Sequence, residues 1–301
     1  MIGSSNTDLV IKTARIPDPG ETVLGGTFLM TAGGKGANQA VAVARLGGDV
    51  TFMAKVGSDM FGDGAIEGYR RDRMDTSFII RDMAAPSGVA LIVVDQKGEN
   101  SIVVAPGANN MLNKNDILAF RSEIEQADYL LMQLEIPMEV IEYAAEIASN
   151  AGVKVILNPA PAADLSDDLL GKLYLITPNR SEASRLTGIA IDSEQSAATA
   201  ADALLARGVS NVVITLGKDG SLIRNASTAL MAPARKVEAQ DTTAAGDTFN
   251  GGLVVALSEG RSLVEAVKFA TSAAAISVTR MGAQASIPCR NELEECSTSK
   301  K

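Results

Sequence analysis

Short apolar runs alternate with helical segments over the later two thirds of the chain. From about residue 110 onward, four runs have the length and continuous hydrophobicity of buried parallel strands: Tyr129–Leu134, Val153–Leu157, Tyr174–Thr177 and Val212–Thr215. Between them, Pro137–Asn150 and Ser193–Arg207 carry apolar residues at helical spacing. This alternation predicts an α/β fold, a mostly parallel sheet sandwiched between two layers of helices. Such sheets bind ligands at the carboxyl ends of their strands.

Two earlier segments do not follow this alternation of strands and helices. Leu9–Thr31 and Ser87–Ala105 have strand-like patterns with little helical signal. We expect residues 9–31 and 87–105 to form one small sheet outside the main layer, acting as a lid, a dimer surface or both. No Pro-rich or Ser-rich linker and no repeat divides the chain, so residues 1–301 are predicted to form a single domain.

The beginning of the sequence offers almost no apolar run. Met1-Ile2 leads directly into the loop-like Gly3-Ser4-Ser5-Asn6. Either the first strand is very short or the native start lies upstream. If in-frame apolar residues precede Met1, we expect that including them raises stability.

The amino-acid composition excludes some classes of binding partner. The net charge is −9, from 27 basic and 36 acidic residues, and aromatic residues make up 4% with no tryptophan. This balance repels a phosphate backbone and offers few stacking platforms, so we expect no nucleic-acid partner. An anionic substrate must be met locally, by backbone amides or a metal ion. No apolar run is long enough to span a bilayer, and no basic leader precedes an apolar stretch, so we expect no membrane association.

The residue types present also limit the chemistry. The chain has no histidine, which excludes catalysis by Ser-His-Asp or Cys-His groups and metal sites with His ligands. Its two cysteines, Cys289 and Cys296, lack metal-binding or redox spacing, and we interpret them as reduced thiols of a cytosolic protein. Catalysis must therefore come from Asp, Glu, Asn, Lys, the backbone and bound ions.

One glycine-rich motif opens a helical run in the first part of the chain. Gly33-Gly34-Lys35-Gly36-Ala37-Asn38 precedes the helical pattern of residues 39–46. Glycines let the backbone approach a ligand, and amides at a helix start favour polar or anionic groups. The spacing is not that of a Walker A loop. A tight strand-to-helix turn without a ligand explains the motif as well.

A second small-residue motif lies near the end of the chain. Asp241-Thr242-Thr243-Ala244-Ala245-Gly246-Asp247 precedes the helix-like residues 249–258. Small residues before a helix leave amide N–H groups free to hold an oxyanion or a phosphoryl group in transfer. The Asp at the edge of this nest can accept a proton from an attacking hydroxyl. The alternative is that Asp247 only caps the helix.

Four stretches taken together resemble the ribokinase family of carbohydrate kinases (the PfkB fold group). They are Gly3–Asp8, Gly33–Asn38, Thr177–Glu182 and Asp241–Asp247, and their order and spacing fit over essentially the whole chain. The resemblance implies a ribokinase-like three-layer sandwich with a central, mostly parallel sheet and a small β-sheet lid that closes on a sugar. It also implies a homodimer formed through the lid.

The resemblance assigns a sugar site and a base. The residues that match the family's sugar contacts are Asn6, Thr7, Asp8, Gly34, Lys35, Gly36, Ala37, Asn38 and Glu135. Asp247 matches the catalytic base, and Ala245 and Gly246 match the anion hole that precedes it.

The resemblance likewise assigns residues to ATP and to cations. Matching the nucleotide contacts are Asn179, Thr215, Leu216, Gly217, Lys218, Asp219, Gly220, Gly246, Asp247 and Thr271. Glu182 matches an acidic residue linked indirectly to Mg²⁺. For a monovalent cation such as K⁺, the matching positions are Asp241, Thr243, Ser277, Arg280, Gly282 and Ser286.

The activity that the resemblance implies is ATP-dependent phosphorylation of D-ribose at O5, giving D-ribose 5-phosphate and ADP. A family member acting on fructose, 2-keto-3-deoxygluconate, deoxyribose or a nucleoside remains an alternative. A sugar sensor without catalytic activity is a third, which the retention of both Asp247 and the glycine motif disfavours.

Overall fold

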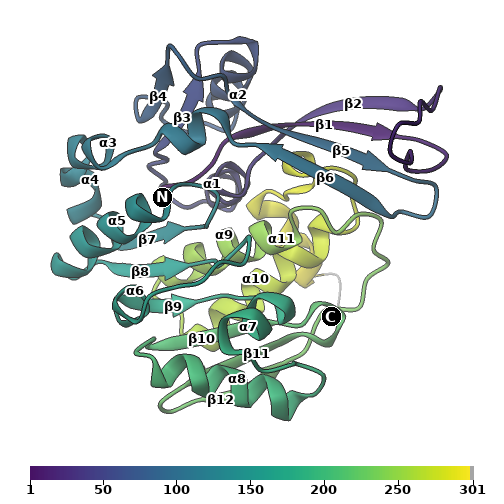
Figure 1. Cartoon of the computed structure of the whole chain (residues 1–301). Helices are drawn as coiled ribbons and strands as arrows, with labels where there is room; N and C mark the ends of the chain where they lie inside the picture. The colour runs from purple at the N-terminus through teal and green to yellow at the C-terminus, as the bar shows by residue number, and fades with distance from the viewer. Residues whose placement is uncertain (299–301) are drawn as a thin grey trace.

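The core is a six-stranded sheet in the computed structural model, which describes residues 1–298 (Figure 1). Its strands run in the order β12-β11-β10-β9-β8-β7. The bounds are β7 (Tyr129–Met132), β8 (Lys154–Leu157), β9 (Leu173–Ile176), β10 (Asn211–Thr215), β11 (Ser221–Asn225) and β12 (Ala229–Ala232). Strands β7 to β10 are parallel, whereas β11 and β12 add an antiparallel edge. The predicted mostly parallel sheet is confirmed.

Alternate residues of each core strand supply the two faces of this sheet. In β8, Val155 and Leu157 pack into one hydrophobic cluster, while Ile156 between them belongs to the other. The first cluster is completed by α5 (Met138–Asn150), α6 (Asp167–Gly171), α7 (Arg180–Thr187) and α8 (Glu194–Ala206). The second is completed by α9 (Ala245–Ser258) and α10 (Leu263–Ser277). Both faces are covered, which explains why these strands are apolar throughout.

The N-terminal part of the chain forms a further group of elements next to β7. It contains α1 (Lys35–Arg45), β3 (Ala54–Gly57), α2 (Met60–Arg71) and β4 (Ile79–Asp82), followed by η1 (Gly107–Met111), α3 (Lys114–Ala119) and α4 (Arg121–Glu125). Strands β3 and β4 pair in parallel as a two-stranded sheet. Ile2 forms isolated parallel bridges to both Met53 and Met132, so the start of the chain lies between this small sheet and β7.

A separate four-stranded sheet projects from the body of the molecule (Figure 1). Its order is β2-β1-β5-β6, with β1 (Asn6–Lys12), β2 (Thr27–Gly33), β5 (Gly88–Val94) and β6 (Asn100–Ala105). The two β-ribbons expected from residues 9–31 and 87–105 do form one small sheet. We call this sheet the lid sheet.

Several element boundaries differ from the sequence-based expectation. The run Tyr129–Leu134 is a strand only as far as Met132, because the chain then leaves the sheet and Leu134 N–H bonds instead to Ala160 C=O. This turn delivers Gln133 and Glu135 to the carboxyl edge of the sheet. The helix expected from residue 249 already begins at Ala245, so Asp247 lies inside its first turn.

The remaining elements are η2 (Gly217–Asp219), η3 (Gln284–Ser286) and α11 (Arg290–Thr298). Cys289 is exposed and forms no disulfide, whereas the side chain of Cys296 lies outside the described residues. Within residues 1–298, no helix has the length and hydrophobicity needed to cross a bilayer.

Candidate active site

Polar residues from four core strands, among them the predicted Glu135, Asn179 and Thr215, meet at the carboxyl edge of the core sheet. Glu135 follows β7, Asn158 follows β8, Asn179 follows β9, and Thr215 ends β10. Parallel strands present their carboxyl ends on one side, so residues far apart in sequence converge there.

Asp247 occupies the centre of this edge, in the first turn of α9. Its carboxylate accepts hydrogen bonds from Asn38 Nδ2 (2.9 Å) and Gln39 Nε2 (3.0 Å), both on α1. Burial raises the pKa of Asp247, opposed by Lys35 and by these two amides. The N-cap of α9 is Ala244, and no side chain caps the helix. The Asp247 carboxylate therefore faces the active-site edge and has no capping role.

The turn before Asp247 exposes backbone amides. Ala244 adopts the left-handed region, with φ 59°, which bends the chain sharply into the helix. The N–H groups of Gly246 and Asp247 belong to the first turn, where a helix supplies no acceptor of its own. They therefore form the kind of amide nest that holds an oxyanion.

Behind Asp247 lies a buried chain of amide side chains that sequence reasoning did not identify. Gln39 Nε2 also donates to Asn158 Oδ1 (3.0 Å), and Gln133 Nε2 donates to Gln39 Oε1 (2.6 Å). Asn158 Nδ2 in turn donates to Thr177 C=O (3.1 Å). These residues fix the orientation of Gln39 and, through it, of Asp247. No sequence signal links them, because each contact joins separate elements.

The glycine motif fits closely against the loop that begins the chain. Gly34 has φ 89°, and a Cβ there would lie 2.7 Å from Asn6 N. A Cβ on Gly36 would lie 2.5 Å from Ser4 N. Ala37 is fully buried, and its N–H donates to Ser4 C=O (2.8 Å). Gly34, Gly36 and Ala37 thus bring α1 against the Gly3–Asn6 loop, which positions Lys35 and Asn38.

Charged groups gather where the lid sheet joins the core. Lys35 Nζ lies 3.5 Å from Glu135 Oε1, and Glu135 Oε2 accepts from Lys35 N–H (2.9 Å) and Ser4 Oγ (2.6 Å). Burial, together with Glu135, raises the pKa of Asp8 to about 6. Burial lowers the pKa of Lys35, but the carboxylates of Glu135 and Asp247 outweigh it, so the net shift is upward.

Asn6 and Asp8 lie two residues apart on β1 and therefore share a face of the lid sheet, with Thr7 turned to the other. Asn109, fully buried in η1, donates from Nδ2 to Asn6 Oδ1 (2.6 Å) and accepts Ser5 N–H (2.8 Å). Asn109 is a further residue that the sequence analysis missed, and it orients Asn6.

Two cavities adjoin next to Asp247, at Thr215 and Gly246. A polar cavity of about 170 Å³ is lined by Lys35, Asn179, Glu182, Gly246 and Asp247. A larger, more apolar cavity of about 360 Å³ is lined by Gly217, Lys218, Gly220, Phe249 and Thr271. Thr215 and Gly246 line both, so the two cavities share a wall at the first turn of α9. One cavity is mainly apolar, and the other contains the Gly246 backbone and the buried Asp247 carboxylate.

Asn179 and Glu182 form a reciprocal cap at the start of α7. Glu182 Oε2 accepts Asn179 N–H (2.8 Å), and Asn179 Oδ1 accepts Glu182 N–H (2.9 Å). Burial raises the pKa of Glu182, with Asn179 and Lys35 opposing. The pair holds a carboxylate at the wall of the polar cavity.

Comparisons with known proteins identify the family of this chain. A model of the pfkB family carbohydrate kinases matches residues 1–290. The chain belongs to this family. It is 47% identical to a ribokinase of Haemophilus influenzae, over 98% of this chain and 96% of the relative.

Two solved structures share the fold over nearly the full length. A ribokinase of Thermotoga maritima is 41% identical with a TM-score of 0.90, covering 99% of this chain and 98% of that one. A ribokinase of Arabidopsis thaliana complexed with ribose and ATP is 30% identical, with a TM-score of 0.91, covering 98% and 96%.

Two residues assigned to the nucleotide loop of this pfkB-family kinase do not line the larger cavity. Leu216 is buried and packs into the core. Asp219 forms an ion pair with Arg180 (2.9 Å). The wall at this point is instead formed by Gly217, Lys218 and Gly220.

The residues assigned to a monovalent cation lie in the loop before α9 and in the segment from the end of α10 to η3. Asp241 Oδ1 accepts from Thr243 N–H (2.9 Å), and Asp241 Oδ2 accepts from Gly282 N–H (2.9 Å). These bonds lower the pKa of Asp241, although burial opposes them. Gln240 N–H bonds to Val278 C=O (2.7 Å), which joins the loops.

Three further residues assigned to the cation form hydrogen bonds or an ion pair with other residues of the protein. Ser277 and Ser286 donate their hydroxyls to carbonyls in their own turns, Ala274 (2.9 Å) and Ala283 (2.8 Å), and Arg280 pairs with Glu292. Over the described part of the chain, no group of three or more Asp, Glu or Cys side chains is arranged to hold a metal ion. A cation here would have to be held mainly by backbone carbonyls and Asp241.

Proposed function

We propose that this protein transfers the γ-phosphoryl group of ATP to O5 of D-ribose, giving D-ribose 5-phosphate and ADP. The observation that carries the proposal is the placement of Asp247. Its buried carboxylate lines a polar cavity, next to Gly246, which also lines an adjoining apolar cavity suited to a nucleotide base. Full-length identity of 47% to a ribokinase supports ribose as the acceptor.

The sugar is held between the lid sheet and the glycine motif. Asn6, Asp8 and Glu135 offer oxygen acceptors to sugar hydroxyls, and Lys35 and Asn38 offer donors. Asn109 fixes Asn6, and Ser4 fixes Glu135. Ribose thereby lies with a primary hydroxyl directed at Asp247. Closure of the lid sheet excludes water, the competing acceptor of the phosphoryl group.

Asp247 accepts the proton of the attacking hydroxyl. Asn38 and Gln39 hold its carboxylate in place, so that the proton-accepting oxygen is oriented before the sugar arrives. The amides of Gly246 and Asp247 form the anion hole, which stabilises charge on the phosphoryl oxygens as the bond to ADP breaks. The Ala245 N–H, predicted to contribute, donates instead to Thr242 C=O (3.2 Å).

The proposed mechanism also uses two cations, Mg²⁺ and K⁺. Glu182 and Asn179 fit the indirect binding of Mg²⁺, which when bound neutralises charge on the ATP phosphates. The loops containing Asp241, Thr243 and Gly282 fit K⁺, held beside the amide nest at Ala244–Asp247. An acidic chain of net charge −9 needs such positive charge near ATP.

We also propose a homodimer formed through the lid sheet, acting in the cytosol, where ATP is available. Strand register places Met30, Leu9, Leu91 and Val103 in one row across the lid sheet. Leu91 and Val103 are 54% and 65% exposed. An apolar row of this kind on an exposed sheet is typical of a protein interface.

The direct test is ADP release with a panel of acceptors: ribose, deoxyribose, fructose, 2-keto-3-deoxygluconate and a nucleoside. We expect the highest kcat/KM for ribose, with phosphorus NMR placing the new ester at O5. Preference for another acceptor would reassign the substrate. Sugar binding without ADP release from any acceptor would favour a non-catalytic sensor.

A further inference from the structure

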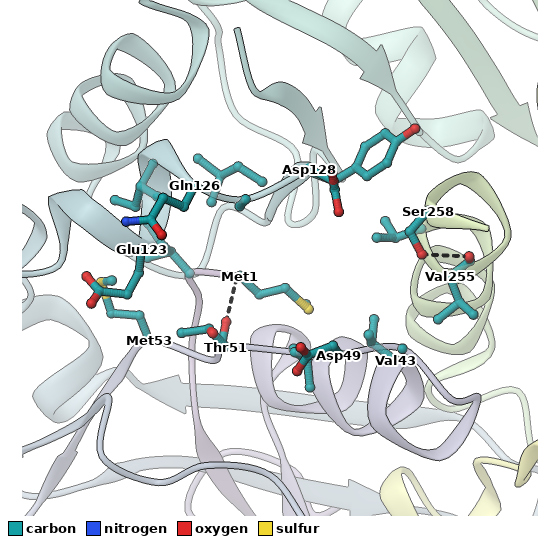
Figure 2. A pocket seen from close by; sticks show the side chains of 18 residues that line it. Met1, Val43, Asp49, Thr51, Met53, Glu123, Gln126, Asp128, Val255 and Ser258 are labelled. Atoms are coloured by element: carbon teal, nitrogen blue, oxygen red, sulfur yellow. Dashed lines mark hydrogen bonds between the residues drawn. The ribbon is translucent and has the colours of Figure 1, made fainter. Parts of the chain in front are cut away.

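Two cavities of the protein have similar volumes but differ in charge. The groove beside Met1, of about 370 Å³, is lined by the carboxylates of Asp49, Glu123 and Asp128 (Figure 2). None of the described residues that line it is Lys or Arg, so this groove repels a nucleoside triphosphate. The apolar cavity of about 360 Å³ adjoins the active site and has no carboxylate among its described lining residues. A nucleotide base therefore fits the second cavity.

This apolar cavity, which we call the base slot, is lined mainly by small aliphatic side chains. Thr271, Ala274, Ala275 and Val278 recur at intervals of three and four residues, so they lie on one face of α10 and its C-terminal end. The segment of residues 234–239, which follows β12, adds two alanines and a valine. Surfaces of this kind pack against the flat faces of an aromatic base.

The edge of a purine ring meets no side chain in the base slot that fits adenine alone. Among the described lining residues, none is Asp, Glu, Asn or Gln. Lys218 and Arg235 line the slot and offer hydrogen-bond donors only. Both purines present acceptors to such donors, N7 on either ring and O6 on guanine. These two side chains therefore do not favour adenine over guanine.

Hydroxyl groups supply the remaining polar side chains of the base slot, and they can pair with either base. Thr271 Oγ1 donates to Val267 C=O (2.8 Å), one turn earlier on α10, so only its lone pairs remain for a base. Lone pairs accept from the adenine amino group and also from the N–H groups of guanine. The other lining hydroxyls rotate between donating and accepting, and they belong to Thr215, Ser221 and Thr242.

We propose that the base slot binds the faces of a purine without reading its edge, so that this kinase uses GTP and ITP as phosphoryl donors besides ATP. The inference rests on the proposed phosphorylation of ribose. With GTP, ribose O5 bonds to the γ-phosphorus, its proton passes to Asp247, and the bond between the γ-phosphorus and the oxygen of the leaving GDP breaks. The same atoms react with ATP, so only the binding of the base can separate the donors.

The expected size of that separation follows from the chemistry of the slot. A site that hydrogen-bonds a polar group of its ligand rejects an analogue without that group by about 10⁴-fold or more. A hydrophobic pocket separates similar molecules by only about 10²-fold or less. The base slot belongs to the second kind, because adenine, guanine and hypoxanthine present the same ring faces.

The test measures formation of ribose 5-phosphate, so that one readout serves every donor. Initial rates with ribose and ATP, GTP or ITP give kcat/KM for each triphosphate. We expect the values for GTP and ITP to lie within about tenfold of the ATP value. A preference for ATP over GTP above about a hundredfold would overturn this inference and leave ribose phosphorylation intact. No ribose 5-phosphate from any donor would overturn the proposed kinase reaction, and this inference with it.

A variant then tests whether both purines use the base slot. Ala274 is half-buried and lines the slot, so Ala274→Leu places a larger side chain against the ring. KM for ATP and KM for GTP should rise by the same factor, at least about fivefold, while KM for ribose stays unchanged. Lys268→Leu is the matched control, because Lys268 is exposed on the same helix and does not line the slot. A rise in KM for ATP alone, or for neither donor, would contradict a shared slot.

Discussion

Burial changes the protonation of Asp8, which we propose binds the sugar. Its carboxyl lies near Glu135 and Asp247, and its pKa is raised to about 6. Below that pH, Asp8 is protonated in the free enzyme and loses its charge as an acceptor for sugar hydroxyls. Burial raises the pKa of Asp247 as well, so the base that we propose is also lost on acidification.

We therefore expect kcat/KM for ribose to fall as the pH is lowered through about 6. In Asp8→Asn the activity should be lower throughout, and the acidic limb should move to lower pH, because removing the Asp8 charge makes Asp247 easier to ionise. Initial rates from pH 5 to 8 measure both profiles. A flat wild-type profile over that range would show that neither carboxyl titrates as the burial implies.

At the scale of elements, the loop before α9 is tied to the loop after α10. Asp241 connects them through Gly282 N–H, and Ala244 begins the helix immediately afterwards. A K⁺ ion between these loops would order the amides without touching ribose.

Turnover should accordingly be faster in K⁺ than in Na⁺ or a bulky organic cation at equal ionic strength. Asp241→Asn should weaken this preference, whereas Asp168→Asn, on the exposed part of α6, should leave it intact. Identical rates in all three salts with the wild-type protein would count against the site.

The lid sheet is the second element with a separate prediction. A charge in the centre of its apolar row should be desolvated in a dimer and tolerated in a monomer. Leu91→Lys is therefore expected to shift the protein to monomer in light scattering, with Kd raised at least about tenfold. Met83→Lys is the control, since Met83 is 88% exposed and lies outside the lid sheet. A wild-type monomer, or a Leu91→Lys dimer of unchanged affinity, would refute the interface.

For the whole molecule, the layers and the small sheet could be predicted because they depend on local hydrophobic patterns. The strand at residues 129–134 was too long by two residues, since nothing local shows that Gln133 and Glu135 turn toward the site. Gln39, Asn109 and Asn158 were missed for a related reason. Their roles arise from hydrogen bonds to residues about 100 or more positions away, as with Gln39 and Asp247, separated by 208 positions.

The family motifs predicted where the charged cluster would form, but not why each glycine is present. Gly36 is needed for the close approach of α1 to Ser4, which only the folded chain shows. In the same way, the structure separates Leu216, a core residue, from Gly217 and Lys218 on the cavity wall.

The central claim is that the whole fold positions Asp247 as a base, and Asp247→Asn tests it most directly. Asn38 Oδ1 has no hydrogen-bond partner among the described residues, so its amide can rotate to accept from the new Asn side chain. The variant should therefore fold with nearly unchanged Tm and similar KM values for ribose and ATP.

The measurement is kcat for ribose-dependent ADP release by Asp247→Asn beside the wild-type protein. Loss of general-base catalysis should lower kcat by about 10² to 10⁴. A folded variant that binds ribose and ATP with kcat reduced to that extent is the predicted result. A folded variant with near-native kcat would contradict the account.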